Sequence, residues 1–490
     1  PGYSKIAIFS GTNNLSIGDA SFLFYEQPFV TTLNPSIGPT HGGSVITISG
    51  INFKDMSNTA CRFGSVSVHP LRVDSTAIEC RAPSYHSPGV VNVEITLNGQ
   101  DFTTSGLLFT YQNPVGINTI APRLGPSTGG TLLEIEGSGF EDSAALSCRF
   151  GSSSPVPAIF ISDSSLRCLT PVSSFKGTVA VEVSTNGIDF STSQAQFQYI
   201  EPFAIQSISP ISGPENGGTI LTITGAHFDS PESFVCEFVW VGLGASAYRV
   251  AATWLSSIAV TCVAPAHPPA STQVRLSANG QQFVTASMPF EYQASSMLVS
   301  VFPASGSVLG GSVVELRGIG FQSLSQCRFG SIVTSATFVD STLIRCVSPS
   351  QKMAGDVNVG VTNNGLDFTS DNVPFSYDEA VAITSVFPNS GPIEGGTHIV
   401  VFGTGFDIAG EMHCRIGGEV QVAKVHNETA LECTSPPSQN AEMVTIEVSK
   451  NGVDFVKSGS TFIYLMPIEV KEAYPSEGAE SGGTSVLIVG

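Results

Sequence analysis

The sequence has few charged residues, and few of these are basic. Charged residues make up 12% of the 490-residue chain, and 20 Lys and Arg stand against 40 Asp and Glu, a formal net charge of −20. An average soluble protein is about 25% charged. Such an acidic chain without a basic run would repel a phosphate backbone, which excludes nucleic acid as a partner. No apolar run approaches the ~18 residues of a transmembrane helix, so we expect no membrane span in this segment.

Motifs that carry catalysis are also missing. The chain has no Cys-x-x-Cys, no His-Glu-x-x-His, no phosphate-binding loop ending in Lys, and no nucleophile elbow between a strand and a helix. Its eight histidines recur at no fixed position. We therefore predict a protein that is not an enzyme and has no catalytic, cofactor-binding or metal-binding residues.

An internal repeat dominates what is present. Gly-Gly pairs recur every 85 to 93 residues, at 42–43, 129–130, 217–218, 310–311, 395–396 and 482–483. A tyrosine ends each unit, at Tyr25, Tyr111, Tyr199, Tyr292, Tyr377 and Tyr464. The predicted boundaries are five complete units, 26–111, 112–199, 200–292, 293–377 and 378–464, flanked by the end of a unit at 1–25 and the beginning of another at 465–490. We expect the chain to be part of a longer array.

Each unit is patterned for short strands. Alternating runs such as Ser44–Gly50 indicate half-buried strands, and Asn98-Gly99 between two such runs is a strong hairpin signal. About seven strands in ~87 residues, without a helical period, predict an immunoglobulin-like β-sandwich. The connections between units are short, so we expect an all-β rod of tandem sandwiches placed end to end.

The ten cysteines fall two to each complete unit: Cys61 and Cys80, Cys148 and Cys168, Cys236 and Cys262, Cys327 and Cys346, Cys414 and Cys433. This even count, locked to the repeat, favours one disulfide inside each sandwich and an oxidising compartment. Buried free thiols in a cytosolic protein are the alternative.

Several motifs recur together in register. These are Pro-x-x-Gly-Pro-x-x-Gly-Gly-Thr/Ser, Gly-x-x-Phe, Cys-Arg-Phe-Gly, Cys-x-x-Pro and Asn-Gly-x-Asp-Phe. Over essentially its whole length the chain resembles tandem IPT/TIG domains of the extracellular type, found in fibrocystin-like and protist surface proteins, plexins and Met-type receptors. The resemblance implies an immunoglobulin-like fold. The third unit departs from the pattern, with Gln282 where other units have Asp101, Asp189, Asp367 and Asp454. One such Asp per unit is too little for a calcium site, so we expect it to close its turn by a hydrogen bond.

The third unit also has a longer stretch between its cysteines, which lie 26 residues apart against 19 or 20 elsewhere. We predict that this apolar stretch is a contact loop formed by Phe238, Trp240, Leu243 and Tyr248. The alternative is a longer strand pair folded onto its own core. Two sequons, at Asn14 and Asn427, are candidate glycosylation sites.

These observations favour a non-enzymatic, extracellular structural or adhesive glycoprotein. Its low charge suits packing into a filament or a cell-surface coat, on a cilium or flagellum by analogy. Its expected partners are other copies of itself, neighbouring surface glycoproteins or glycans. The alternatives are the stalk of a plexin-like or Met-like receptor and an accessory array of a secreted carbohydrate-active enzyme.

Overall fold

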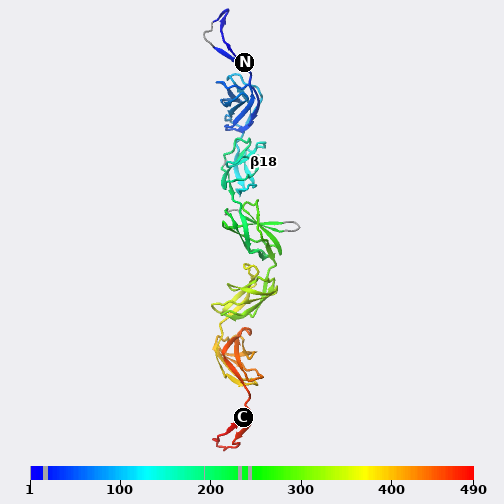
Figure 1. The fold of residues 1–490 in the computed structure, drawn as a ribbon, viewed down its shortest axis with the longest axis vertical. Coiled ribbons are helices and arrows are strands. Elements are labelled where there is room, and N and C mark those ends of the chain that lie inside the picture. The colour runs from blue at the N-terminus through cyan, green and yellow to red at the C-terminus, as the bar shows by residue number, and fades with distance from the viewer. Residues whose placement is uncertain (1, 15–19, 193, 230–233, 241–245) are drawn as a thin grey trace.

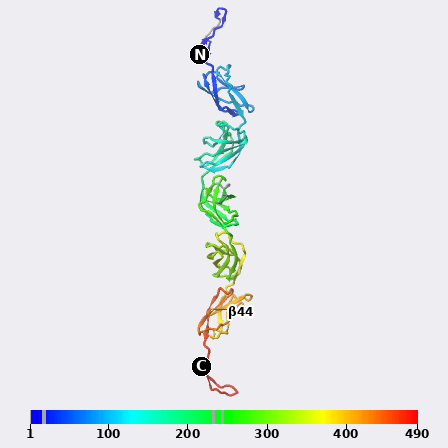
Figure 2. The ribbon, with the colours of Figure 1, turned by 90° about the vertical axis from the view of Figure 1, so that its right-hand side faces the viewer.

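The computed structural model describes residues 2–14, 20–192, 194–229, 234–240 and 246–490. Within these ranges every regular element is a β-strand. Five sandwiches follow one another along a single line (Figure 1), and they keep this line after a quarter turn (Figure 2). The predicted all-β rod of tandem sandwiches is therefore confirmed.

The first domain shows the common plan of two packed sheets. One sheet has the strand order β10-β11-β7-β5 and the other β6-β13-β12-β8-β9. Short β6 runs parallel to the last strand, and all other pairs in this domain are antiparallel. The strands are β5 (Phe29–Asn34), β6 (Ile37–Pro39), β7 (Val45–Ile51), β8 (Ala60–Phe63), β9 (Val66–Val68), β10 (Pro70–Val73), β11 (Ala77–Arg81), β12 (Gly89–Thr96) and β13 (Leu108–Gln112).

In the second, fourth and fifth domains one long strand belongs to both sheets, so each domain forms a continuous eight-stranded path. The second domain comprises β14 (Gly116–Ala121), β15 (Leu124–Pro126), β16 (Leu132–Ser138), β17 (Ser147–Phe150), the long β18 (Val156–Ser162), β19 (Ser165–Leu169), β20 (Gly177–Ser184) and β21 (Gln196–Ile200). The fourth comprises β32 (Met297–Phe302), β33 (Ser305–Ser307), β34 (Val313–Ile319), β35 (Gln326–Phe329), the long β36 (Ile332–Asp340), β37 (Leu343–Val347), β38 (Gly355–Thr362) and β39 (Val373–Asp378). The fifth comprises β40 (Ala382–Phe387), β41 (Ser390–Pro392), β42 (His398–Thr404), β43 (Met412–Ile416), the long β44 (Glu419–Asn427), β45 (Ala430–Thr434), β46 (Met443–Ser449) and β47 (Val456–Leu465).

The third domain has separate strands in place of that long strand, as the first domain does. In the first domain the interruption lies next to Pro70, which has no amide hydrogen for the ladder. The strands of the third domain are β22 (Ala204–Ser209), β23 (Ser212–Pro214), β24 (Ile220–Ala226), β25 (Val235–Trp240), β26 (Ala247–Ala251), β27 (Thr253–Ser256), β28 (Ala259–Val263), β29 (Ala270–Ser277), β30 (Val284–Thr285) and β31 (Phe290–Gln293).

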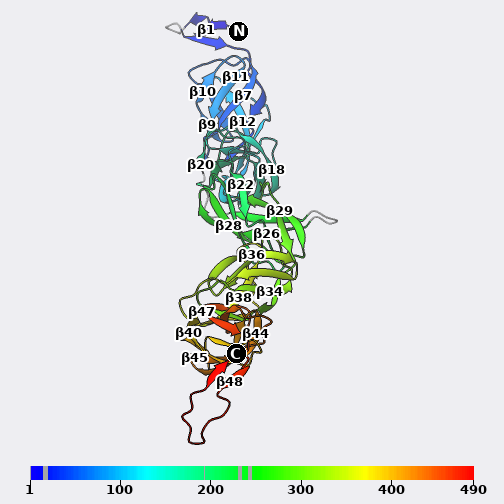
Figure 3. The ribbon, with the colours of Figure 1, turned by 60° about the horizontal axis from the view of Figure 1, so that its bottom comes forward.

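Short strand pairs lie at both ends of the rod. β1 (Gly2–Lys5) pairs with β4 (Ser21–Phe24), β2 (Phe9–Ser10) pairs with β3 (Asn13–Asn14), and β48 (Glu472–Tyr474) pairs with β49 (Leu487–Val489). Figure 3 shows β1 and β48 at opposite ends of the molecule.

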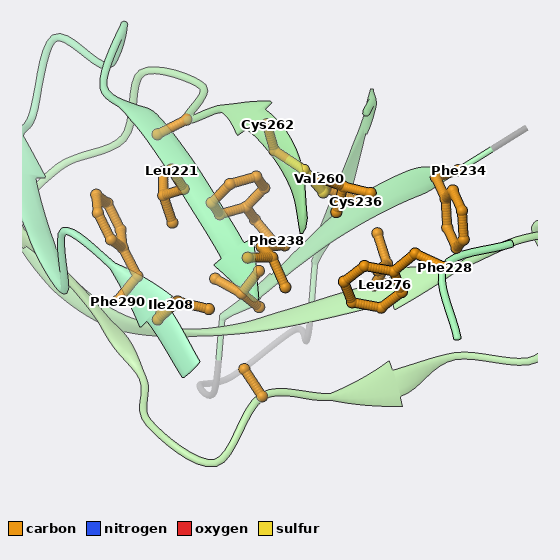
Figure 4. Packing of buried hydrophobic residues seen from close by; sticks show 14 of the residues in the cluster. Ile208, Leu221, Phe228, Phe234, Cys236, Phe238, Val260, Cys262, Leu276 and Phe290 are labelled. Carbon is orange, nitrogen blue, oxygen red and sulfur yellow. A yellow bond between two sulfur atoms is a disulfide. The ribbon is translucent and has the colours of Figure 1, made fainter. Parts of the chain in front are cut away.

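Each domain buries a hydrophobic core of its own, and a disulfide crosses that core from one sheet to the other. In the third domain Cys236 on β25 joins Cys262 on β28 beside Phe238 and Leu221 (Figure 4). Disulfides join the corresponding strands of the other domains at Cys61–Cys80, Cys148–Cys168, Cys327–Cys346 and Cys414–Cys433, with Cα atoms 6.2–6.4 Å apart. A closed loop of ~20 residues stabilises a domain by roughly 3 kcal/mol in the chain-entropy model.

Close backbone packing explains the glycine of the Gly-Gly pair. Gly42 has a φ of 75°, and a Cβ atom there would lie 2.6 Å from the carbonyl carbon of Pro83. Pro83 belongs to the Cys-x-x-Pro motif, so two motifs that are distant in sequence meet here. A larger residue at Gly42 would be both strained and in collision.

Candidate interaction sites: the domain joints and the third domain

The Asn-Gly-x-Asp turn closes on itself through its first side chain. The Asn98 Oδ1 atom accepts hydrogen bonds from the backbone amides of Gln100 (2.9 Å) and Asp101 (2.8 Å). The Asn98 Nδ2 atom donates to the Asp101 carboxylate at 2.7 Å. The expected turn-closing role of the aspartate is thus present in the structure, and it leaves the amide and the carboxylate side by side at the tip. We call this four-residue tip the joint turn.

From the second domain onward, the joint turn contacts the domain before it. Asn186 Nδ2 donates to the Ile37 carbonyl at 3.0 Å, and the Ser44 hydroxyl donates to the Asp189 carboxylate at 2.5 Å. The third and fourth domains repeat both bonds: Asn364 donates to the Ser212 carbonyl at 2.8 Å, and the Thr219 hydroxyl donates to the Asp367 carboxylate at 2.6 Å. At the next joint Asn451 donates to the Ser305 carbonyl at 2.7 Å. The carbonyl and the hydroxyl that meet the joint turn form what we call the seat.

Glycine shapes the seat. In the first domain a Cβ atom at Gly38 would lie 2.5 Å from the Ser44 Oγ atom, so the hydroxyl occupies the space that a side chain would fill. The same glycine-hydroxyl contact recurs in the later domains, at Gly125 with Thr131, Gly213 with Thr219, Gly306 with Ser312 and Gly391 with Thr397. The Gly-Pro motif and the Thr or Ser after Gly-Gly therefore build one local structure.

Glutamine replaces aspartate at the joint between the second and third domains and makes more contacts. Gln282 accepts a hydrogen bond from the Thr131 hydroxyl (3.2 Å) and donates one to the Gly130 carbonyl (2.9 Å). The neighbouring Gln281 accepts from the Leu132 amide (2.9 Å) and donates to its carbonyl (2.8 Å). An amide side chain both donates and accepts, which a carboxylate cannot do.

A second contact recurs at two joints. The residue after the closing tyrosine bonds to the residue after Gly-x-x-Phe of the next domain: Gln112 donates to Glu141, and Gln293 donates to Gln322 at 3.1 Å. At these two joints, therefore, a second set of residues adds a hydrogen bond to those of the joint turn.

The residue after the joint turn anchors it to its own sheet. Phe102 lies under the Arg62 guanidinium, 3.7 Å from ring centroid to Cζ, and Arg62 pairs with Glu94 across the strands. Arg-Phe contacts recur in all five domains, with centroid distances of up to 4.8 Å. In the third domain the positions of the acidic and basic residues are reversed. Glu237 occupies the position that Arg62 has in the first domain, and it pairs with Arg249 and Arg275.

The predicted contact loop is partly wrong. Phe238 is fully buried in the core of the third domain, because it lies two residues from Cys236 on the same face of β25. Trp240 is half-buried against that core and stacks on His267 with ring centroids 4.2 Å apart. Tyr248 on β26 is 54% exposed. Leu243 lies outside the described residues.

The outer ends of β25 and β26 point away from the rod axis (Figure 1). Strand β25, with six residues, is longer than its counterparts β8, β17, β35 and β43, which have four or five. It packs Phe238 into its own core, as the folded-strand alternative anticipated, while its partner β26 presents Tyr248 to solvent.

Both candidate glycosylation asparagines are exposed in the structure. Asn427 ends β44, and its Oδ1 atom accepts hydrogen bonds from the Thr429 amide and hydroxyl at 2.9 and 2.8 Å. Asn14 lies on β3, whereas the rest of its sequon lies outside the described residues. Occupancy of these sites stays a prediction.

The described residues hold no group of three or more His, Cys, Asp or Glu side chains placed for a metal ion. In the same part of the chain, no helix has the length and hydropathy needed to cross a bilayer.

The family model of the IPT/TIG domain matches five stretches of this chain, at residues 28–111, 114–199, 202–292, 297–377 and 382–464. The chain belongs to the IPT/TIG family. Fibrocystin-L of Mus musculus is 26% identical over 95% of this chain, and plexin-B2 of Mus musculus is 26% identical over 42% of it. The chain spans only 11% and 12% of these two relatives, respectively.

Solved structures with similar folds include the plexin A4 extracellular region. It is 15% identical, with a TM-score of 0.29, over 92% of this chain and 52% of that one. The chain is an IPT/TIG array of the extracellular type, with one disulfide in each complete IPT/TIG domain.

Proposed function

We propose that this IPT/TIG array is a non-enzymatic, extracellular structural or adhesive rod that packs side by side into a filament or cell-surface coat. The observation that carries the proposal is the row of five disulfide-closed sandwiches with hydrogen-bonded joints (Figure 1). Five disulfides suit an oxidising compartment. The similarity to fibrocystin-L over 95% of the chain supports a place at the cell surface.

Exposed apolar pairs at one register position support side-by-side packing. Ile220 and Val263 are cross-strand partners in the third domain and are 57% and 51% exposed. The same position holds the exposed pair Val313 and Val347 in the fourth domain. In the second domain it holds the exposed Leu169 opposite the half-buried Leu132. Burying these side chains against a neighbouring rod would be favourable, and the low charge of the chain keeps the desolvation cost small.

A receptor stalk is the second candidate. The 26% identity to plexin-B2 over 42% of the chain favours it. A stalk needs a stiff rod but no contact between rods, so the two functions differ in whether the protein assembles.

Electron microscopy of the protein purified under non-reducing conditions tests the choice. We expect ordered fibres or sheets, lost when Val313 and Val347 are both changed to Ser. The matched control is Val45→Ser in the first domain, where the cross-strand partner is Arg81; it should assemble normally. A parallel Tyr248→Ser variant tests the projecting strand pair of the third domain. Separate rods at every concentration would reject the coat and favour the stalk.

A further inference from the structure

The seat of the fifth domain has the same construction as the four seats that meet a joint turn. A Cβ atom at Gly391 would lie 2.2 Å from the Thr397 Oγ1 atom, the same distance as at Gly125 with Thr131 and Gly213 with Thr219. The hydroxyl and the Ser390 carbonyl are thus positioned by the fold of this domain alone.

The burial of the fifth seat differs from that of the others. In the four other seats the hydroxyl residue is only 0–3% exposed, because a joint turn covers it or the carbonyl beside it. These residues are Ser44, Thr131, Thr219 and Ser312. Thr397 falls outside this buried group, and Gly391 is also half-exposed, whereas the four corresponding glycines are buried.

The chemistry of the seat defines what fits it. The carbonyl accepts one hydrogen bond and the hydroxyl donates one. A joint turn offers the matching pair at its tip, an amide nitrogen that donates and a carboxylate or amide oxygen that accepts, 2.6–2.9 Å apart. Because the turn fixes both groups before contact, little side-chain entropy is lost on docking.

Residues 472–489 indicate which domain supplies the turn. β48 and β49 form an antiparallel pair like β5 and β7 of the first domain, and Pro475 directly follows β48 as Pro35 directly follows β5. A Cβ atom at Gly478 would lie 2.8 Å from the Thr484 Oγ1 atom, as in the other seats. These residues therefore have the opening structure of another IPT/TIG domain, and six residues (466–471) separate them from Leu465.

We propose that Ser390 and Thr397 form a docking site for the Asn-Gly-x-Asp or Asn-Gly-x-Gln turn of the IPT/TIG domain that begins at this strand pair. Docking at this seat fixes the orientation of that domain relative to the fifth domain. A second copy of the chain is the competing occupant, and in its first domain residues between 22 and 28 already line a hollow together with Asn98, Gln100 and Asp101 of the joint turn.

An extended chain tests the proposal. In this extended chain, residues 1–464 are joined to a second copy of residues 112–199, which form a domain with its own core and disulfide. Spin labels on non-natural amino acids replace Val422 and the Val172 of the added domain, both exposed. The distance distribution between the labels reports how firmly the added domain is held.

We expect a narrow distribution that Thr397→Val broadens at least twofold, while Thr397→Ser leaves it narrow because the seats of the first and fourth domains use serine. Asp189→Ala in the added copy alone should broaden it equally. Equal widths for all variants would overturn the proposal. A further control carries a flexible Gly-Ser insertion between the fifth and the added domain, and a parent distribution as broad as that of this control would also overturn it. So would a narrow distribution that appears only at high concentration, which would mean contact between two chains. An unchanged melting temperature of Thr397→Val confirms that the fifth domain still folds.

Discussion

The Thr219 hydroxyl of the third domain donates a 2.6 Å hydrogen bond to the carboxylate of Asp367, which lies 148 residues later in the fourth domain. Asp367 is held in place by Asn364, whose amide also bonds to the Ser212 carbonyl. Within its own domain Thr219 directly precedes strand β24, and Asp367 closes the joint turn of its domain. The same two residues also form the contact between the two domains. The orientation of the domains is encoded in motifs that also build each sandwich.

Loss of this hydroxyl should loosen the joint between the third and fourth domains. A hydrogen bond to a charged group contributes about 1.5–3 kcal/mol, and Thr219→Val removes it while keeping the side-chain volume. We expect a wider distance distribution between spin labels on these two domains and a shorter maximum dimension in small-angle scattering. Thr219→Ser keeps the hydroxyl and should behave as the parent. A rod as stiff with valine as with threonine would show that the linker alone sets the angle.

The glutamine joint between the second and third domains offers a separate test. Gln281 bonds to both the amide and the carbonyl of Leu132, so Gln281→Ala removes two hydrogen bonds across the joint. We expect this change to raise amide hydrogen exchange at Leu132 and to widen the angle distribution at this joint. Gln100→Ala is the matched control, because Gln100 holds the same turn position in the first domain. Exchange at Leu132 that stays at the parent rate would contradict the assignment.

The sequence predicts the turn but not the joint. Asn98-Gly99 between alternating strands identifies a hairpin, and the Asp after it was expected to close the turn, as it does. The contact of Asp189 with Ser44 could not be predicted in the same way, because it depends on how one folded domain sits on the next. In the sequence, nothing distinguishes Ser44 from any other polar residue at the start of a strand.

The error at Phe238 had a signal within the repeat. Phe238 follows Cys236 by two residues, as Phe63 follows Cys61 in Cys-Arg-Phe, and alternate residues of a strand share one face. Since the cysteine must reach the core to form its disulfide, the phenylalanine must do so as well. The greater separation of the cysteines in the third domain masked this correspondence.

The ion pair of the fifth domain, in which the carboxylate is buried, should matter more than the Arg-Phe contact at the same position of the fourth domain. Arg415 pairs with Glu447, whose side chain is only 7% exposed, whereas Arg328 lies opposite Gly360 and contacts Phe368. Arg415→Ala leaves a carboxylate buried without its partner, which costs about 3–5 kcal/mol. Arg328→Ala loses chiefly a cation-π contact worth about 0.5–1 kcal/mol.

Native-state hydrogen exchange separates the two domains in the intact chain. We expect protection on β46 to fall strongly in Arg415→Ala and protection on β38 to fall only slightly in Arg328→Ala. Equal losses would mean that Glu447 is adequately solvated without Arg415.

The closing tyrosines should make the domains sensitive to alkali. Burial raises the pKa of Tyr111 and of Tyr199 from 10.0 to about 12. The Tyr111 hydroxyl donates a 2.8 Å hydrogen bond to the Pro83 carbonyl, and that of Tyr199 donates a 3.2 Å bond to the Pro171 carbonyl. Because the folded state holds these protons more tightly than the unfolded state, their contribution to stability is complete below pH 10 and is lost as the pH rises to about 12.

Urea unfolding between pH 8 and pH 11.5 measures this loss, with hydrogen-exchange or proteolytic readouts for each domain. The first domain should weaken steeply above pH 10 in the parent. Tyr111→Phe removes the ionisable group at the cost of about 1 kcal/mol for the lost hydrogen bond, and should flatten that dependence in the first domain while the second keeps it. Since both proteins carry nearly the same growing negative charge, general repulsion affects them alike. A first domain that weakens as steeply with phenylalanine as with tyrosine would assign the alkaline loss to repulsion instead.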